Sequence, residues 1–160
     1  MITAEKLREL MEYDADTGVM RWRVRMSNFC HAGRIVGTLQ SRRGLETHIA
    51  RKSYQVHRLI WLWVYGEWPK YTIDHINGNR EDNRLCNLRD VSMMGNCQNQ
   101  RRAKSTSKTG ILGVIKVGSR YKASITAGYK LKHIGTFATA QEAHAAYLRV
   151  KREIHATCVI

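Results

Sequence analysis

Three side chains of one polar segment have the chemistry needed for metal-assisted hydrolysis. His75 can accept a proton near neutral pH, which makes it a candidate general base. Asp74 offers hard carboxylate oxygens that suit Mg²⁺ or Mn²⁺, and Asn96 could add an amide oxygen as a second ligand. So few protein ligands leave positions for water and phosphate oxygens, and the residue types therefore favour hydrolysis of a phosphodiester.

These residues need secondary structure that brings them together. A short strand over Tyr71–Ile76, a polar loop, a second strand and a polar helix follow one another within residues 71–100. Neighbouring residues on a regular strand point to opposite faces, so Asp74 and His75 can act on one phosphate only at the edge of the strand, or where it is twisted or bulged. The amide of Asn87 could tie the second strand to the loop and fix the backbone around His75.

Each of these residues also has a simpler interpretation. Asp-His pairs are common, and most of them bind no metal. Asn87 and Asn96, taken singly, could be ordinary loop or cap residues. Cys86, Cys97 and His75 could in principle hold zinc, but their spacing matches no common zinc site.

Taken together, the motifs resemble those of the HNH homing endonucleases of phages and mobile introns. HRLIW at 57–61, DHINGNREDNRLCNLR at 74–89 and NCQNQ at 96–100 occur in the family's order. The resemblance covers about residues 54–100. It implies a ββα-metal fold, bound to one divalent cation, that cuts DNA.

The resemblance also implies a role for each motif residue. His75 would be the general base, Asp74 and Asn96 the metal ligands, and Asn87 the residue that braces the loop. Many family members have His where this chain has Asn96, so the chain is an H-N-N variant, which homing members also use. Asn is a harder ligand than His and favours Mg²⁺.

The chain is strongly basic, and the charge is concentrated toward its end. It has 27 Lys and Arg against 13 Asp and Glu, a formal net charge of +14. Residues 101–160 contain 12 basic and 2 acidic residues, a net charge of +10. This balance favours nucleic acid as partner over a membrane or an acidic protein, and the alternative is a generally basic soluble protein.

The C-terminal third shows a sheet followed by a helix. Strand-like segments lie near 111–117, 120–127 and 131–137. A helix is expected to begin after Thr139, because Glu142 three residues later completes a capping box. Its apolar stripe would cover one face of the sheet. The stripe contains Ala143, Tyr147, Val150 and Ile154.

This third resembles the Apetala-type DNA-binding domain of plant transcription factors. The motifs are GV at 113–114, YKASI at 121–125, IGTFAT at 134–139 and EAHAAY at 142–147, with Tyr121 where the family has tryptophan. The resemblance implies a three-stranded antiparallel sheet that lies in the DNA major groove, with one helix behind it. The DNA contacts expected on this sheet are Arg120, Lys122, Lys130 and Lys132.

The N-terminal region is predicted to be rich in β-strands. A short helix is expected over 3–12, strands near 34–40 and 45–56, and a buried helix over 57–66 that ends at Gly66. Residues 19–25 alternate and predict a further strand with an apolar face of Met20, Trp22 and Val24. Its opposite, basic face would contact DNA through Arg21, Arg23 and Arg25. Further DNA contacts are expected at Arg80, Arg101 and Arg102.

The predicted fold class is α+β, in two lobes. Residues 1–100 would form the endonuclease domain, with a β-rich part at 1–56 and the metal core at 57–100. A basic linker over 101–109 would lead to the DNA-binding domain at 110–160. Double-stranded DNA is the expected partner of a monomer or weak dimer. The main rival is a DNA-binding protein with a decayed nuclease core; a protein that binds or cleaves RNA is a third possibility.

The cysteines and the hydropathy pattern bear on where the protein acts. Cys30, Cys86, Cys97 and Cys158 form no C-x-x-C pair, which favours free thiols in a reducing compartment such as the cytoplasm. No apolar run approaches the roughly 18 residues of a membrane helix, and the charged N-terminus does not resemble a signal peptide.

Overall fold

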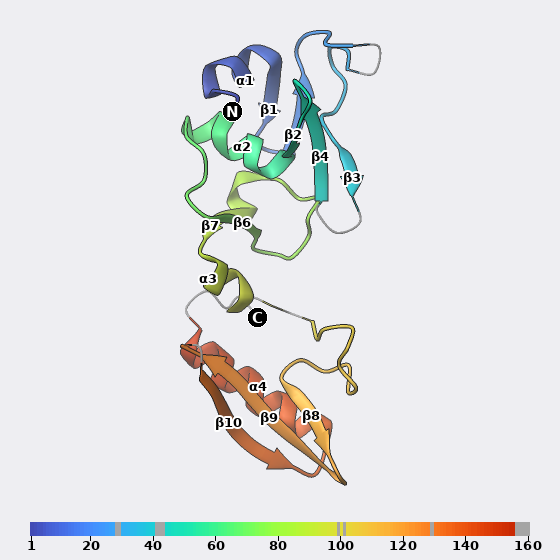
Figure 1. The fold of residues 1–160 in the computed structure, drawn as a ribbon, viewed down its shortest axis with the longest axis vertical. Helices are drawn as coiled ribbons and strands as arrows, with labels where there is room; N and C mark the ends of the chain where they lie inside the picture. Colours follow the sequence, from blue (N-terminus) through green and yellow to red (C-terminus); the bar gives the residue numbers. More distant parts are fainter. Residues whose placement is uncertain (28–29, 41–43, 99, 101, 129, 156–160) are drawn as a thin grey trace. The chain divides into compact units, whose positions relative to one another are not determined.

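The computed structural model describes residues 1–27, 30–40, 44–98, 100, 102–128 and 130–155. The chain forms two compact units, Met1–Ser92 and Met93–Ile160 (Figure 1). The sequence places the domain boundary near residue 100, whereas in the structure the short helix with Asn96 belongs to the second unit. Both units combine helices with small antiparallel sheets, as the predicted α+β class requires.

In its described residues the first unit contains two helices, a 3-10 turn and three small sheets. In chain order its elements are α1 (Ala4–Leu10), β1 (Met11–Asp14), β2 (Val19–Trp22), β3 (Thr38–Gln40), β4 (Gly44–Ile49), β5 (Lys52–Gln55), α2 (Val56–Tyr65), β6 (Thr72–His75), η1 (Leu85–Asn87) and β7 (Leu88–Val91). The sheets pair β1 with β2, β3 with β4 and β5, and β6 with β7, all antiparallel.

Pairing of the strands explains where the predicted elements were wrong. The helix expected over 3–12 ends at Leu10, because Met11 pairs with Trp22 in the β1–β2 hairpin. That pair is the last one of the hairpin, so the strand expected over 19–25 ends at Trp22 and leaves Val24 exposed. The predicted apolar face therefore contains Met20 and Trp22 only.

The segment expected as one strand over 45–56 is a hairpin. Its turn consists of Ala50 and Arg51, both with positive φ, the backbone combination that reverses a hairpin in two residues. Similarly, the second strand of the polar segment starts only at Leu88, after the 3-10 turn η1.

Helix α2 is the centre of the first unit's core, as its dense apolar residues predict. It ends where Gly66 adopts the left-handed conformation and its N–H binds the Leu62 carbonyl. Trp61 and Trp63 pack against the core. The other buried core residues are Ala4, Leu7, Leu10, Met11, Met20, Trp22, Val36, Ile49, Ile73 and Leu88.

The second unit is a three-stranded sheet with one long helix. Its elements are α3 (Met93–Gln98), β8 (Val114–Val117), β9 (Arg120–Ala127), β10 (Lys130–Phe137) and α4 (Ala140–Ile154). The strand order is β10–β9–β8, with β9 in the middle and a bulge between His133 and Gly135 (Figure 1). Helix α4 packs on one face of this sheet. The core between them is Val114, Ala123, Ile125, Ala143 and Tyr147.

The predicted capping box at the start of α4 is confirmed. The Thr139 hydroxyl accepts a hydrogen bond from the Glu142 backbone N–H, and the Glu142 carboxylate accepts one from the Thr139 N–H, each at 3.2 Å. The predicted stripe is correct for Ala143 and Tyr147, whereas Ile154 is exposed.

None of the helices in the described parts of the chain is long and apolar enough to cross a membrane.

Replacing Thr139 by alanine should weaken the second unit. The change leaves the first N–H groups of α4 without their side-chain acceptor, and we expect a loss of about 1 kcal/mol in the free energy of unfolding. Urea denaturation followed by circular dichroism measures it. Thr106, an exposed threonine outside the helices and strands of this unit, provides the control, since Thr106→Ala should be close to neutral. An equal loss in both variants would contradict the capping role.

Candidate functional site

His75 is the last residue of β6 and is buried. Its Nε2 lies 2.9 Å from the Oδ1 of Asn83. An amide oxygen can only accept a hydrogen bond, so the Nε2 of His75 carries the proton. The Nδ1 of the neutral ring then keeps its lone pair, which is the state of a general base.

His57 is the second histidine of the site and lies in the first turn of α2. Its ring meets the ring of His75 edge to face, with centroids 5.2 Å apart and planes at 87°. The pKa of His57 is lowered to about 3, mainly by burial, and the neighbouring His75, Arg58 and Arg80 act in the same direction. His57 is therefore neutral at neutral pH and places no positive charge beside His75.

Asn87 connects the two ends of the loop that contains Asn83. Its Oδ1 accepts the backbone N–H of Asn77 at 2.9 Å, and its Nδ2 donates to the backbone carbonyl of Asp82 at 2.7 Å. Both the donor and the acceptor of this buried amide are used, so rotating or removing it would break two backbone contacts. These are contacts of the kind a bracing residue makes.

The Asp82 carboxylate organises the middle of the same loop. It binds the guanidinium of Arg84 through two parallel contacts, Nε–Oδ1 at 2.8 Å and Nη2–Oδ2 at 2.7 Å. The side-chain amide of Asn77 donates to it as well, at 2.7 Å. The hydrogen bond from Arg84 is the main cause that holds the pKa of Asp82 well below its usual range.

The β1–β2 hairpin supports the loop at Asn83. The Tyr13 hydroxyl donates to the backbone carbonyl of Asn83 at 3.0 Å. Gly18, with φ of +74°, lies so close that a Cβ there would be 2.4 Å from the Arg84 nitrogen and 2.7 Å from the Asn83 carbonyl carbon. The loop therefore fits against the hairpin only because residue 18 has no side chain.

Asp74 faces away from His75. Strands β6 and β7 pair without a bulge, with Asp74 opposite Arg89 and His75 opposite Leu88, so the two side chains lie on opposite faces. Both Nε and Nη2 of Arg89 donate to the Oδ2 of Asp74, at 3.1 and 2.8 Å. This ion pair engages one of the two carboxylate oxygens.

The two metal ligands predicted from the sequence, Asp74 and Asn96, are of types that suit a hard divalent cation. A carboxylate and an amide oxygen are ligands that Mg²⁺ accepts. In the described residues no three His, Cys, Asp or Glu side chains are grouped to hold a metal ion. Asn96 is half-buried on α3 of the second unit, while Asp74 and His75 belong to the first.

The basic residues predicted to bind DNA in the first unit are exposed. Arg21 donates to the Gly33 carbonyl at 3.0 Å, and Arg23 to the Arg8 carbonyl at 3.2 Å, so their guanidinium groups are held by the backbone. The other exposed residues of this set are Arg25, Arg80 and, in the second unit, Arg102. Arg101 lies outside the described residues.

In the second unit the register separates the four predicted DNA contacts. Arg120 and Lys122 alternate with the buried Ala123 and lie on the face of the sheet away from α4. Lys132 pairs with Ile125, which belongs to the core between sheet and helix. Lys130 and Lys132 therefore lie on the other face, at the exposed edge strand β10, and the structure does not bring the four together.

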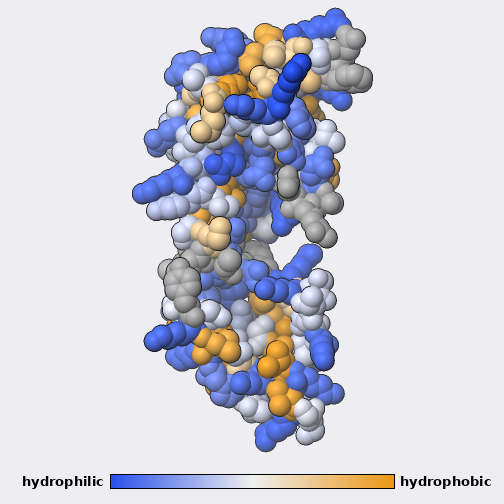
Figure 2. All heavy atoms as spheres, in the orientation of Figure 1, coloured by the Kyte–Doolittle hydropathy of each residue, from blue (hydrophilic) through white to orange (hydrophobic). Residues whose placement is uncertain are grey.

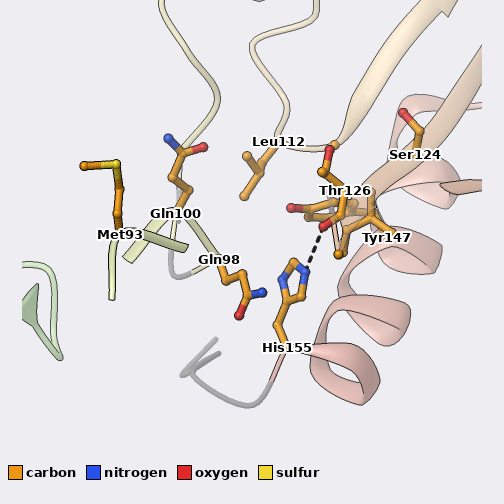
Figure 3. Close-up of a pocket in the computed structure, with 11 residues that line it drawn as sticks. Met93, Gln98, Gln100, Leu112, Ser124, Thr126, Tyr147 and His155 are labelled. Carbon is orange, nitrogen blue, oxygen red and sulfur yellow. Dashed lines mark hydrogen bonds between the residues drawn. The ribbon is translucent and has the colours of Figure 1, made fainter. Parts of the chain in front are cut away.

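A pocket of the second unit lies near its C-terminal helix (Figure 3). Leu112, Thr126 and Tyr147 line it beside His155, whose Nε2 is 3.1 Å from the Thr126 carbonyl oxygen. The remaining lining residues are Met93, Gln98, Gln100, Gly113, Ser124, Ile125 and Gly128. No carboxylate is among the described lining residues, so they offer no acidic partner for hydrolysis.

Sequence reasoning did not identify Asn83, Tyr13, Gly18 or Arg89 as parts of the site. Asn83 is one of several asparagines in the polar loop, and only its contact with His75 distinguishes it. His57 was not identified either, although its place in the HRLIW motif was a usable signal.

Comparison with known proteins supports a nuclease. Residues 54–97 match the family model of the HNH endonucleases. The match begins before α2, includes β6 and β7, and ends within α3. Proteins with this domain hydrolyse nucleic acid and generally use a divalent metal. Searches among curated proteins and among solved structures gave no match to the chain.

The lowered pKa of His57 predicts an acid-sensitive first unit. Between about pH 6.5 and 3 the unfolded chain binds a proton at this residue and the folded unit does not. The free energy of unfolding should therefore decrease as the pH is lowered through this range. His57 contributes at most about 1.4 kcal/mol per pH unit to this decrease. Urea denaturation followed by tryptophan fluorescence, between pH 7 and 5, measures this slope. His57→Gln should flatten this slope, whereas His48→Gln, at an exposed histidine, should leave it unchanged. Equal slopes in the wild-type protein and both variants would contradict the prediction.

Gly18→Ala should disturb the loop that contains Asn83. The methyl group is strained by the positive φ, at a cost of about 1 kcal/mol, and it also collides with the Asn83–Arg84 backbone, which adds about 1–3 kcal/mol. Gly33 also has a positive φ, of +80°, and a Cβ there meets nothing within 4 Å. Gly33→Ala therefore measures the strain alone. The prediction is wrong if the two variants unfold at the same urea concentration.

Proposed function

We propose that this protein is a DNA endonuclease of the homing or phage-encoded type, with His75 as general base and one Mg²⁺ or Mn²⁺ ion. The observation that carries the proposal is the hydrogen bond between His75 and Asn83 inside the segment that matches the HNH family. It selects the ring tautomer that a base needs.

The reaction is an attack of water on a DNA phosphorus. Nδ1 of His75 takes a proton from the water, whose oxygen forms a bond to phosphorus while the bond from phosphorus to the 3′-oxygen breaks. The leaving oxygen takes up a proton, and the products have a 5′-phosphate and a 3′-hydroxyl. Asp74 and Asn96 would hold the cation at the end of β6, where Asp74 and His75 could both reach one phosphate from the edge of the strand. The cation would supply positive charge to the phosphate and the leaving oxygen.

Asn83 and Asn87 are proposed to position the base. Proton transfer requires that His75 presents Nδ1 in a fixed direction, and the bond from its Nε2 to Asn83 fixes both tautomer and ring. Asn87 in turn fixes the backbone at Asn77 and at Asp82, the residue directly before Asn83. When His75 becomes protonated, the neutral His57 adds no repulsion to the new charge.

Duplex DNA is the proposed substrate because of the basic residues outside the nuclease core. Arg21, Arg23 and Arg25 are exposed near one hairpin, and Arg80, Arg101 and Arg102 would add further contacts. The sheet and helix of the second unit, similar in sequence to the Apetala-type domain, have a net charge of +10 over residues 101–160. Binding by such a surface should weaken steeply with salt.

One metal site makes one incision, so cutting both strands requires a second copy or a second binding event. We propose a monomer or weak dimer. Cys30 and Cys86 are free thiols, which suits the reducing cytoplasm of a host cell.

A second candidate function is DNA binding without cleavage. The ion pair between Asp74 and Arg89 supports it, because the arginine competes with a cation for the carboxylate oxygen Oδ2. A protein in which this pair persists would hold DNA and leave it intact.

Plasmid cleavage distinguishes the two functions. Purified protein with supercoiled plasmid and Mg²⁺ should produce open-circular or linear DNA, and EDTA should abolish this product. His75→Ala should lower the rate by about 100- to 10,000-fold, the usual contribution of a general base, and should still shift the plasmid on a gel. The matched control is His48→Ala, an exposed histidine that should leave the rate unchanged.

The ratio of open-circular to linear product reports whether one or both strands are cut. If wild-type protein shifts the plasmid but does not cut it or fragmented genomic DNA, with either Mg²⁺ or Mn²⁺, the endonuclease proposal fails and DNA binding without cleavage replaces it.

A further inference from the structure

The face of the β8–β9–β10 sheet away from α4 combines aliphatic and basic side chains. The register places Ile115 beside Lys122 and Val117 beside Arg120, across β8 and β9. On the other side of β9, Leu131 lies beside Thr126. Residues paired directly across antiparallel strands project to the same face, so these side chains share one surface.

The aliphatic side chains of this surface are well exposed to solvent. The exposed fraction is 53% for Ile115, 54% for Val117 and 71% for Leu131. Figure 2 shows hydrophobic side chains between hydrophilic ones over the strands of this unit. Helix α4 already covers the opposite face and forms the core with Val114, Ala123 and Ile125. The three exposed residues are therefore not needed to close this unit's core.

Charge identifies nucleic acid as the partner that covers this surface. Arg120 and Lys122 stand in the same cross-strand rows as Val117 and Ile115. Residues 101–160 contain 12 basic and 2 acidic residues, which favours a polyanion over a second copy of the same basic unit.

The spacing of the surface suits the major groove of a duplex. Residues on one face of a strand repeat every ~6.8 Å, close to two base-pair steps of 3.4 Å, and neighbouring strands are ~4.8 Å apart. The major groove is ~12 Å wide and admits strands. The apolar group that B-DNA displays there is the C5-methyl of thymine, whereas the other base-edge groups in the groove are hydrogen-bond donors and acceptors.

We propose that Ile115, Val117 and Leu131 read thymine methyl groups in the major groove, while Arg120 and Lys122 hold the duplex. Aliphatic side chains offer no donor or acceptor to a base edge, so contact with a methyl group is the base discrimination that they can provide. This inference rests on the proposed duplex DNA substrate and adds a preference for thymine-rich sites to it.

Binding to duplexes that differ only in this methyl group tests the inference. The probes are a 30-base-pair duplex of alternating dA and dT and the same duplex with dU in place of every dT. At every position along the first duplex the protein meets methyl groups in the major groove. At no position along the second duplex does it meet one. The protein is the full chain with His75→Ala, in EDTA, so that binding is measured without cleavage, by fluorescence anisotropy.

We expect tighter binding to the dT duplex. One buried methyl is worth about fourfold in affinity, so two or more contacts should give about tenfold or more. The triple variant Ile115→Ala, Val117→Ala and Leu131→Ala should bring this ratio close to one and leave affinity for the dU duplex nearly unchanged. These residues are exposed, so the unit should still fold, and circular dichroism checks that it does.

Two control variants separate methyl readout from general binding. Leu39→Ala changes a comparably exposed leucine of the first unit, 52% exposed on β3, and should keep the wild-type ratio. Lys122→Ala should weaken binding to both duplexes equally and reduce the dependence of affinity on salt.

Several results would overturn the inference. Equal affinity for the dT and dU duplexes would show that the surface holds DNA without reading methyl groups. Tighter binding to an RNA duplex of matching sequence, or loss of self-association in the triple variant, would assign the surface to another partner. Cleavage is blocked in this assay, so it measures DNA binding only. The plasmid test measures cleavage through His75, and a failure of one test is therefore distinct from a failure of the other.

Discussion

The hydrogen bond between His75 and Asn83 is the contact on which the first unit depends. Both side chains are buried, and a buried polar group without a partner costs about 1–3 kcal/mol. Each therefore requires the other in place. A loop of polar residues has no apolar face that could fix its conformation, so the position of Asn83 has to come from hydrogen bonds and from the elements around it.

Three parts of the first unit supply that position from different directions. Asn87 ties the loop ends together, Tyr13 holds the Asn83 carbonyl, and Gly18 lets the hairpin approach the loop backbone. Helix α2 completes the enclosure by placing the ring of His57 against that of His75. The N-terminal hairpin is in this way a support for the proposed base.

Sequence patterns predicted the elements whose causes are local. The capping box of Thr139 and Glu142, the glycine that ends α2, and the alternation of β9 each depend on neighbours a few residues away. Contacts between distant segments were not predictable in the same way. The end of β2 is set by the length of its partner β1. The choice of Asn83 among the loop asparagines and the pairing of Asp74 with Arg89 depend on which strands become neighbours.

Both units depart from ordinary patterning at the residues of the proposed sites. The first buries His57, His75, Asn83 and Asn87, and the second exposes Ile115, Val117 and Leu131. Burial of polar groups lowers the stability of a unit unless each finds a partner, and exposure of aliphatic groups forgoes the gain of packing them. Folding alone favours neither arrangement. Local departures of this kind are expected where a site does chemistry or recognises a partner. In this protein they place the proposed chemistry in the first unit and the proposed recognition of bases in the second.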